Sequence, residues 1–378
     1  MDISRTAYGI WSGGRFSSFG KPLDDERFFS AIRRAYHRGI RTFITGDVYG
    51  KGAGDELLAR GLEGFPRDTY ALVGMIGYDF YRGQNNGSAG YPRFTDPALR
   101  THRDYADYLQ MATEKSLARC RVTRFDCLLL HNPDFTGYSQ DSVWNAMAKL
   151  KESGLTERLG LAPGPANGFT LDLILCFERF HSLLDWAMII LNPFEPWPGC
   201  LCLNAAEKHG VDLITRAVDH GGIFHDDVHP VRTFSPLDQR KFRPAGWIEA
   251  ADEKLEEIRP IAERHGLTLL QLACLWNLAH QPVKCVVPTM IEETGEDAKS
   301  IEQKINELTD LPEIELSASE VEEIARVGDN KNSIALKGAT PEHDGDPLPD
   351  RWSLTRDLQS VAARWEIEPQ RDLTSTAP

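Results

Sequence analysis

Short apolar runs alternate with longer segments of helical spacing along most of the chain. The runs are continuously apolar, which is typical of strands buried on both faces of a parallel sheet. The intervening segments place apolar residues three or four positions apart, as at Phe28, Ile32 and Ala35, and predict helices. The predicted strands are residues 6–11, 41–44, 71–76, 125–130, 159–162, 186–191, 211–216 and 283–287. The predicted helices are residues 24–38, 55–62, 102–119, 141–152, 171–180, 200–208 and 300–308.

Eight strand and helix alternations are the number that closes a (β/α)8 TIM barrel, an α/β fold, and the pattern predicts this barrel for residues 1–334. The main alternative is an open, doubly wound sheet. It is disfavoured because no Gly-x-Gly-x-x-Gly follows an early strand. Residues 335–378 change composition, with Pro, Asp and Gly followed by a helical stretch at 354–365. They predict a C-terminal extension packed on the barrel and frayed at its end.

Two long insertions, residues 77–101 and 218–247, follow the third and seventh predicted strands. Loops that follow the strands of a barrel lie on the face where active sites are built. Loops of this length are usually lids or disordered segments. Aromatic residues such as Tyr78 and Phe80 favour an ordered lid, and a loop packed on the barrel rim is the alternative.

Charge and cysteine content narrow the classes of partner and compartment. The chain has 42 Lys and Arg against 56 Asp and Glu, a net charge of −14, which disfavours nucleic acid and anionic membranes as partners. Hydrophobic residues at 41% and charged residues at 26% indicate a globular protein with ample core material. The seven cysteines are odd in number and lie mostly in apolar runs, which favours a reducing compartment. With no basic and apolar leader pattern and no apolar stretch long enough to span a bilayer, the expected location is cytoplasmic.

Polar side chains that follow predicted strands are the candidates for chemistry. A Tyr and a His at different strand ends can share a cleft and pass a proton to or from a substrate oxygen. Each could instead be structural, His131 as a strand cap and Tyr49 as a core aromatic. The candidates are Asp47, Tyr49, His131, Asn132, Asn192, Glu195, Arg216, Asp219 and His220. The sequence His225-Asp226-Asp227-Val228-His229 offers metal-ligand types, but the following Pro230 favours a solvated polar loop.

Several motifs resemble the aldo/keto reductase family. Residues 42–52 (TFITGDVYGKG) and 55–58 (DELL) are similar to its signature, in which a strand ends in Asp-Thr-Ala-x-x-Tyr-Gly and runs into a helix. Residues 128–132 (LLLHN) resemble its Leu-Leu-x-His segment, and residues 155–161 resemble its fifth strand. Residues 265–276 and 283–288 are similar to its penultimate helix and last strand. The resemblance covers roughly residues 6–330.

The resemblance implies a barrel that binds NADP(H) or NAD(H) and reduces a carbonyl on a small substrate. The family's catalytic tyrosine falls on Tyr49, the proton donor, and its histidine on His131, which orients the carbonyl. The resemblance also implies cofactor contacts from Arg216, which takes a ring-stacking position, and from Asn192 and Thr289.

The chain departs from the family at the Asp and Lys of the catalytic tetrad, where Ile44 and Met75 stand. Replacing both members of a buried ion pair with apolar groups can be nearly neutral, whereas removing one strands a charge. Without an ammonium nearby, Tyr49 should hold its proton more tightly, which favours carbonyl reduction over alcohol oxidation. The positions of the family's amide-anchoring Ser, Asn and Gln carry Ala162, Pro163 and Met188.

The substrate is expected to be a small, sugar-like or cyclic molecule held by Trp11, Asp47, Tyr78 and Trp197, although core packing is the alternative for each aromatic. Two other functions stay open. One is a non-redox lyase, isomerase or hydrolase that uses Tyr49 and His131 for proton transfer. The other is a catalytically silent barrel that binds a ligand. The oligomeric state is left open.

Overall fold

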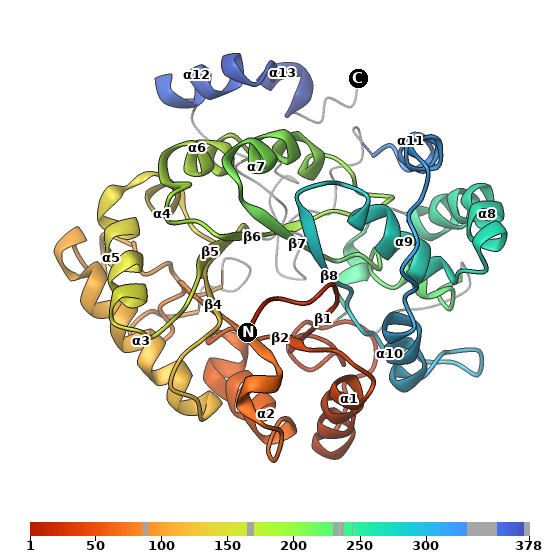
Figure 1. Cartoon of the computed structure of the whole chain (residues 1–378), viewed down its shortest axis with the longest axis horizontal. Coiled ribbons are helices and arrows are strands. Elements are labelled where there is room, and N and C mark those ends of the chain that lie inside the picture. The colour runs from red at the N-terminus through yellow and green to blue at the C-terminus, as the bar shows by residue number, and fades with distance from the viewer. Residues whose placement is uncertain are drawn as a thin grey trace.

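Eight parallel strands pair in chain order from β1 to β8 and form the inner wall of the molecule (Figure 1). A parallel bridge between Thr6 and Val286 joins the last strand to the first. The predicted (β/α)8 barrel is therefore confirmed. The strands are β1 (Ala7–Gly9), β2 (Thr42–Ile44), β3 (Ala71–Ile76), β4 (Cys127–His131), β5 (Leu159–Ala162), β6 (Trp186–Ile190), β7 (Asp212–Arg216) and β8 (Val283–Val287).

The computed structural model describes residues 1–85, 90–164, 170–229, 234, 238–243, 245–330 and 354–373. The α-helices surround the strands, and the two together bury one continuous apolar core (Figure 1). They are α1 (Asp25–His37), α2 (Ala53–Gly61), α3 (Tyr105–Cys120), α4 (Phe135–Ser139), α5 (Asp141–Glu152), α6 (Thr170–Phe180), α7 (Leu203–His209), α8 (Trp247–His265), α9 (Leu269–Leu278), α10 (Ile301–Thr309), α11 (Ala318–Val327), α12 (Arg356–Arg364) and α13 (Pro369–Asp372).

The region around His265 differs from the sequence prediction. Residues 265–276 do not form one helix, because α8 ends at His265 and Gly266 takes a left-handed φ of 64°. Thr268 then caps α9, and its hydroxyl accepts the N–H of Gln271 in a capping box. The 19-residue helix α8 was not predicted as a separate element.

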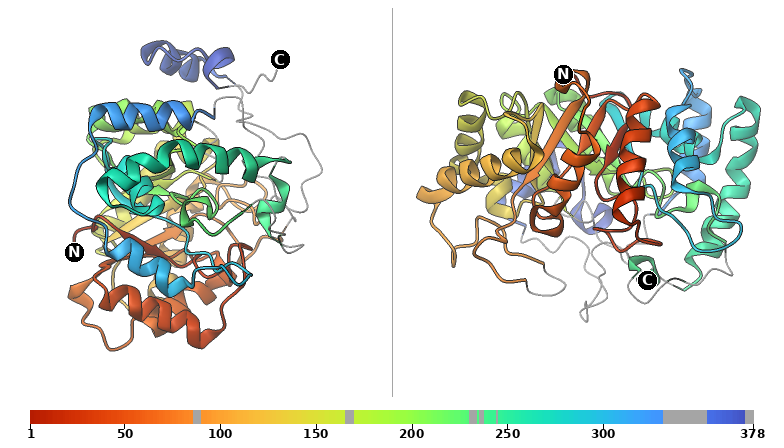
Figure 2. Two further views of the ribbon diagram at one scale, coloured as in Figure 1. Left: turned by 90° about the vertical axis from the view of Figure 1, so that its right-hand side faces the viewer. Right: turned by 90° about the horizontal axis from the view of Figure 1, so that it is seen from below.

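The two insertions emerge at the carboxyl ends of the strands, on the side opposite the N-terminus (Figure 2, right). The insertion after β3 is closed at its base by a bridge between Tyr78 and Arg93 and by the buried ion pair of Asp79 with Arg100. The insertion after β7 reaches the loop after β1, where the N–H of Gly20 donates to Asp238 at 2.8 Å. Residues 86–89, 230–233, 235–237 and 244 of these insertions lie outside the described residues.

The C-terminal segment lies against the outside of the barrel at α6 (Figures 1 and 2). Leu358 and Val361 of α12 are fully buried. The indole N–H of Trp365 donates to Glu178 of α6 at 2.9 Å. This helix is therefore held by both apolar burial and a polar anchor, while residues 331–353 and 374–378 of the predicted extension lie outside the described residues.

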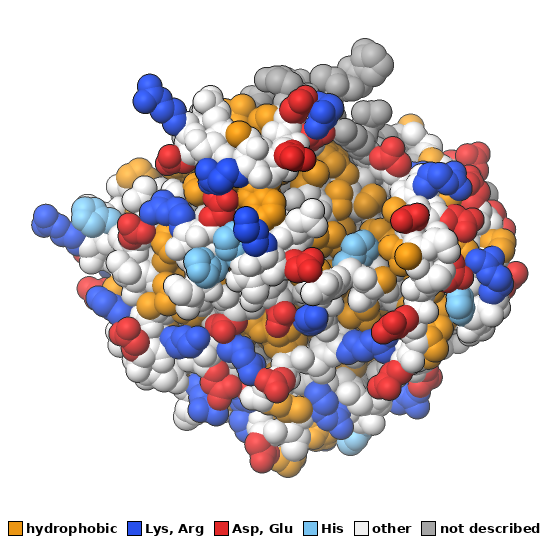
Figure 3. All heavy atoms as spheres, turned by 45° about the horizontal axis from the view of Figure 1, so that its top comes forward, with side chains coloured by type: hydrophobic (Ala, Val, Ile, Leu, Met, Phe, Trp, Pro, Cys, Tyr) orange, Lys and Arg blue, Asp and Glu red, His pale blue; other side chains and the backbone are white. Residues whose placement is uncertain are grey.

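Charged side chains of both signs are interspersed over the face drawn in Figure 3, which includes the described C-terminal helices. Across the described residues no helix combines the length and apolar content needed to cross a membrane.

Candidate active site

Tyr49 is positioned by a sharp turn at the carboxyl end of β2. It opens a 3₁₀ turn (Tyr49–Gly52) in which Gly50, Lys51 and Gly52 all have positive φ, from 57° to 98°. This turn redirects the chain into α2 and leaves Tyr49 beside the strand end. A Cβ on Gly46 would lie 3.1 Å from the Tyr49 ring and 3.2 Å from Cε of Met75, so glycine permits this close approach.

His131 is the last residue of β4 and pairs in register with Ala162 of β5. Its ring centroid lies 5.9 Å from that of Tyr49, with the planes inclined at 53°. The ring of Tyr78 lies 5.2 Å from His131 in an edge-to-face arrangement at 86°. The structure thus gathers two phenols and one imidazole at the ends of β2, β3 and β4.

The surroundings keep the phenol protonated and the imidazole neutral. Ile44 and Met75 are fully buried. Burial raises the pKa of Tyr49 to about 12, against an opposing effect of the Arg216 charge. Burial, together with the charges of Arg93 and Arg216, lowers the pKa of His131 to about 3. The buried Nδ1 of His131 has no hydrogen-bond partner among the described residues.

Arg93 and Asn132 join this constellation; Asn132 was a candidate from the sequence, and Arg93 was not. The guanidinium carbon of Arg93 lies 3.9 Å from the centroid of the Tyr78 ring, and its Nε donates to the carbonyl of Asn132. Asn132, with a φ of 46°, donates its side-chain amide to the Tyr78 hydroxyl. The bridge between Tyr78 and Arg93, flanked by backbone hydrogen bonds, brings Arg93 here, and no local sequence pattern signals that pairing.

The three residues expected to contact the cofactor differ in how many of their polar groups are already hydrogen-bonded within the protein. Arg216, half-buried at the end of β7, donates Nη2 to the carbonyl of Pro163 at 3.1 Å and has no carboxylate partner in the described chain. Asn192 is fully buried, and its side chain holds Glu195 and the carbonyl of Ala217. Both backbone groups of Thr289 are engaged, its N–H with a buried carboxylate and its carbonyl with a buried imidazole.

The residues expected to bind substrate also differ, since some lie beside the rings of Tyr49 and His131 and others are engaged elsewhere in the protein. The Trp11 ring lies 6.2 Å from that of Tyr49, beside the gathered rings. Asp47 is fully buried, and its pKa is raised by burial and by the charge of Asp55, with Arg119 opposing. A direct contact of Asp47 with substrate would require the residues that bury its carboxylate to move apart.

Trp197 is held by the C-terminal segment. Its indole N–H donates to the carbonyl of Asp372 at 2.6 Å, and its backbone N–H donates to Asn330 at 3.0 Å. The structure therefore places Trp197 in a structural contact and does not bring it to the rings of Tyr49 and His131 by any described interaction.

A second polar cluster lies at the ends of β6 and β7. Glu195 accepts from His220 Nδ1 at 3.2 Å, and Arg243 Nη1 lies 3.3 Å from the other ring nitrogen of His220. A cavity of about 230 Å³ adjoins this cluster and is also lined by Trp247 and Lys254. Burial and the Arg243 charge lower the pKa of His220, so this histidine is also neutral near pH 7.

The segment 225–229, which offers metal-ligand types, is engaged in protein contacts. His225 Nε2 lies 2.9 Å from the carbonyl of Thr289, and Asp227 is paired with the buried Lys304 at 2.7 Å. Within the described ranges, no group of three or more His, Cys, Asp or Glu side chains is arranged to hold a metal ion.

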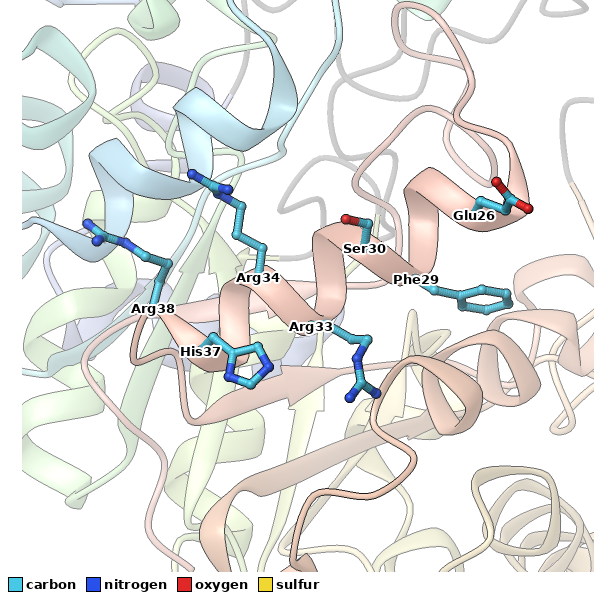
Figure 4. A pocket seen from close by; sticks show the side chains of 7 residues that line it. All are labelled: Glu26, Phe29, Ser30, Arg33, Arg34, His37 and Arg38. Carbon is cyan, nitrogen blue, oxygen red and sulfur yellow. The ribbon is translucent and has the colours of Figure 1, made fainter.

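A shallow depression on α1 has a different character (Figure 4). Its lining side chains all come from this one helix on the outside of the barrel, and Arg34 and Arg38 point away from Arg33 and His37. None of them follows a strand end, so this depression lacks the position at which barrels assemble active sites.

The geometry can be set beside known proteins. The family model described as "Aldo/keto reductase family" matches residues 7–329. The chain belongs to the aldo/keto reductase family. A probable aldo-keto reductase 1 of Glycine max is 24% identical over 327 residues, which cover 83% of this chain and 85% of that protein. The versiconal hemiacetal acetate reductase of Aspergillus parasiticus is 23% identical, with 74% and 83% covered.

Solved structures agree on the fold of this aldo/keto reductase. The glycerol dehydrogenase of Gluconobacter oxydans has a TM-score of 0.68 at 22% identity and covers 89% of this chain and 94% of its own. An aldo-keto reductase of Klebsiella pneumoniae, solved in complex with NADPH, has a TM-score of 0.55 at 18% identity, with 86% and 91% covered. At these identities the likeness shows the barrel and its chain order.

Proposed function

We propose that this aldo/keto reductase is an NAD(P)H-dependent reductase of carbonyl compounds, with Tyr49 as the proton donor and His131 orienting the carbonyl. The observation that carries the proposal is that the ring centroids of Tyr49 and His131 lie 5.9 Å apart at the strand ends of the family barrel. Burial keeps the phenol protonated and the imidazole neutral. A neutral imidazole can donate a hydrogen bond to a carbonyl oxygen without becoming charged.

The residues present fit the nicotinamide end of a dinucleotide cofactor better than its phosphate-bearing end. Arg216 offers a planar guanidinium next to Tyr49 and could stack on the nicotinamide ring. The phosphate-bearing end is less open, because the carboxylate of Asp219 accepts the N–H groups of Thr289 and Gly222 at 2.6 and 2.9 Å. Those two amides are therefore committed to a carboxylate of the chain and are not free for phosphate.

The proton chemistry follows from the pKa of Tyr49. The bound cofactor supplies the hydride to the carbonyl carbon. The carbonyl oxygen then needs a proton, which Tyr49, with a pKa of about 12, can give. The acceptor is an alkoxide, which is about as basic as hydroxide, whose conjugate acid, water, has a pKa of about 16. The reverse reaction needs a tyrosinate, which at pH 7 would be about one molecule in 10⁵. Reduction is therefore the favoured direction.

The pH dependence of this reduction is expected to be flat. His131, with a pKa of about 3, stays neutral above about pH 4, and Tyr49 stays protonated below about pH 11. The value of kcat/KM reports the free enzyme, so measured between about pH 5 and pH 9 it should show no break from either group. A break near pH 6.5 that disappears in His131→Asn would mean that a charged imidazole takes part, contrary to the proposal.

Cofactor binding is the decisive test of the proposed function. Titration of NADPH and of NADH, followed by fluorescence and by calorimetry, should give saturable binding of at least one of them. Arg216→Ala should weaken that binding, because the ring platform is lost, whereas Arg103→Ala, an exposed residue before α3, should not. Absence of binding by both dinucleotides would reject the reductase and leave proton-transfer chemistry or ligand binding on the same barrel.

A further inference from the structure

Two guanidinium groups lie near enough to His131 for their charges to act on it, and each is held by a backbone carbonyl at a strand end. Arg93 donates Nε to the carbonyl of Asn132, the residue after His131. Arg216 donates Nη2 to the carbonyl of Pro163 at 3.1 Å. Pro163 follows Ala162, the register partner of His131. The ends of β4 and β5 therefore fix both cations next to the imidazole.

Over the residues that the structure describes, neither guanidinium forms an ion pair. Both are half-buried, whereas the two buried Arg side chains of the described chain are each paired with a carboxylate. Arg100 is paired with Asp79 and Arg240 with both Asp238 and Glu293, and the half-buried Arg119 is paired with Asp55. The chain carries a net charge of −14, so carboxylates are not scarce, and their absence beside Arg93 and Arg216 is a local property of the mouth.

Arg93 is also held rigid. Its guanidinium stacks on Tyr78 at 3.9 Å, and Nη1 donates to the carbonyl of Tyr91 at 3.3 Å. Tyr78 is fixed in turn, because its carbonyl accepts from the Tyr108 hydroxyl at 2.6 Å. No hydrogen bond of Nη2 of Arg93 is found among the described residues, so one N–H edge of a fixed guanidinium is available. An ordered fork of this kind suits oxyanion recognition, since little side-chain entropy is left to lose.

The other groups at the mouth add no negative charge. Burial keeps the proton on Tyr49 and keeps His131 neutral, and Ile44, Met75 and Trp11 are apolar. The closest acidic influence on Arg216 is Glu195, which is bound to His220 and Asn192. A substrate that enters this opening therefore meets the Arg93 guanidinium, which no described carboxylate pairs with.

We propose that the substrate is a carbonyl compound that carries an oxyanion, a carboxylate or a phosphate ester, and that Arg93 binds this group while His131 and Tyr49 face the carbonyl. This inference rests on the proposed function for the reaction, but binding of an oxyanion at this site requires no cofactor. It makes Arg93 a specificity-determining residue. The uncharged sugar-like or cyclic substrate expected from the aromatic residues would lack the group that pairs with this cation.

The test compares charged and uncharged aldehydes of similar size. Succinic semialdehyde is paired with butanal, and glyceraldehyde 3-phosphate with glyceraldehyde, so that the two pairs distinguish a carboxylate from a phosphate. We expect kcat/KM to be about 10- to 100-fold higher for the charged member of at least one pair, the range of a charge-assisted hydrogen bond. This preference should decrease as salt is added. Equal kcat/KM values within both pairs would overturn the inference.

Variants assign the preference to Arg93. Arg93→Met should remove most of it, lowering kcat/KM for the charged aldehydes far more than for the uncharged ones. Arg93→Lys should restore part, because it keeps the charge and loses the planar fork. The matched control is Arg82→Met on the same insertion, an exposed side chain with no described contact, which should change nothing. An equal loss for charged and uncharged aldehydes in Arg93→Met would show a structural role and contradict the inference.

A readout without cofactor separates this inference from the reductase proposal. Calorimetry of the wild-type protein with 4-hydroxybutyrate and with 1-butanol should show binding of the acid that Arg93→Met abolishes and Arg82→Met retains. If no aldehyde is reduced with either dinucleotide but this binding is found, the reductase is rejected and the oxyanion site stands. If the acid does not bind, the oxyanion site is rejected whatever the turnover.

Discussion

Replacing Tyr49 with phenylalanine is expected to lower kcat/KM for carbonyl reduction by about 10²- to 10⁴-fold, the usual contribution of a general acid. The hydroxyl is the only group removed, and no described hydrogen bond is lost with it. The ring keeps its contacts with Trp11 and His131, at centroid distances of 6.2 and 5.9 Å. The dissociation constant of the dinucleotide and the free energy of unfolding should therefore stay close to those of the wild type.

Tyr8→Phe is the matched control for this variant. Tyr8 belongs to β1, is 1% exposed, and its buried hydroxyl has no partner among the described residues. The same atom is thus removed from the same barrel at a site without assigned chemistry, and activity should not change. A Tyr49→Phe protein that keeps its kcat/KM within threefold would show that Tyr49 is not the donor, and Tyr78 would be the next tyrosine to substitute.

Introducing a lysine at Met75 is expected to lower the free energy of unfolding by about 3–5 kcal/mol, the cost of an uncompensated buried charge. Met75 is fully buried, and its methyl group approaches Gly46, which the Tyr49 ring also approaches. Ile44, also fully buried, would give the ammonium no partner. Urea denaturation of Met75→Lys measures the loss, and Met75→Leu, which conserves volume, should cost less than about 1.5 kcal/mol.

The double variant Ile44→Asp with Met75→Lys tests whether these two positions act as a pair. A double-mutant cycle should give a favourable coupling of about 0.5–3 kcal/mol, because the new carboxylate compensates the new ammonium. The ammonium should also lower the pKa of Tyr49 and raise the rate of alcohol oxidation at pH 7. A cost below about 1 kcal/mol for Met75→Lys alone would mean that water reaches this position and that the environment of Tyr49 is not apolar.

The barrel could be predicted from the sequence because its strands are continuous apolar runs. The predicted limits of β3 and β5 coincide with the observed Ala71–Ile76 and Leu159–Ala162. The break between α8 and α9 was missed although Gly266 and Thr268 signal it, because the resemblance suggested one helix across both. Local turn chemistry took precedence over the family pattern.

The site could be predicted only in part. Tyr49 and His131 were found because strand ends of one barrel meet at the same face, and their residue types were visible in the sequence. Arg93 was missed because its place depends on pairing with Tyr78 across a long insertion, which no periodicity encodes. In the sequence, Asp47 and Trp197 cannot be told apart from residues that face the opening at the strand ends. Only tertiary packing buries the carboxylate of Asp47 and covers the Trp197 indole.

Burial of Asp47 and His131 makes folding exchange protons in two opposite directions. Below pH 6.5 the unfolded chain protonates His131, whereas the folded protein does not until about pH 3, so this group withdraws stability as acidity increases. Above pH 3.8 the unfolded chain releases the proton of Asp47 that the folded protein retains, so this group withdraws stability as acidity decreases. Where the two ranges overlap, one proton is shed and one is taken up for each molecule that folds. Each slope is about 1.4 kcal/mol per pH unit, and within the overlap the two cancel, so this pair makes no net contribution to the pH dependence of folding there.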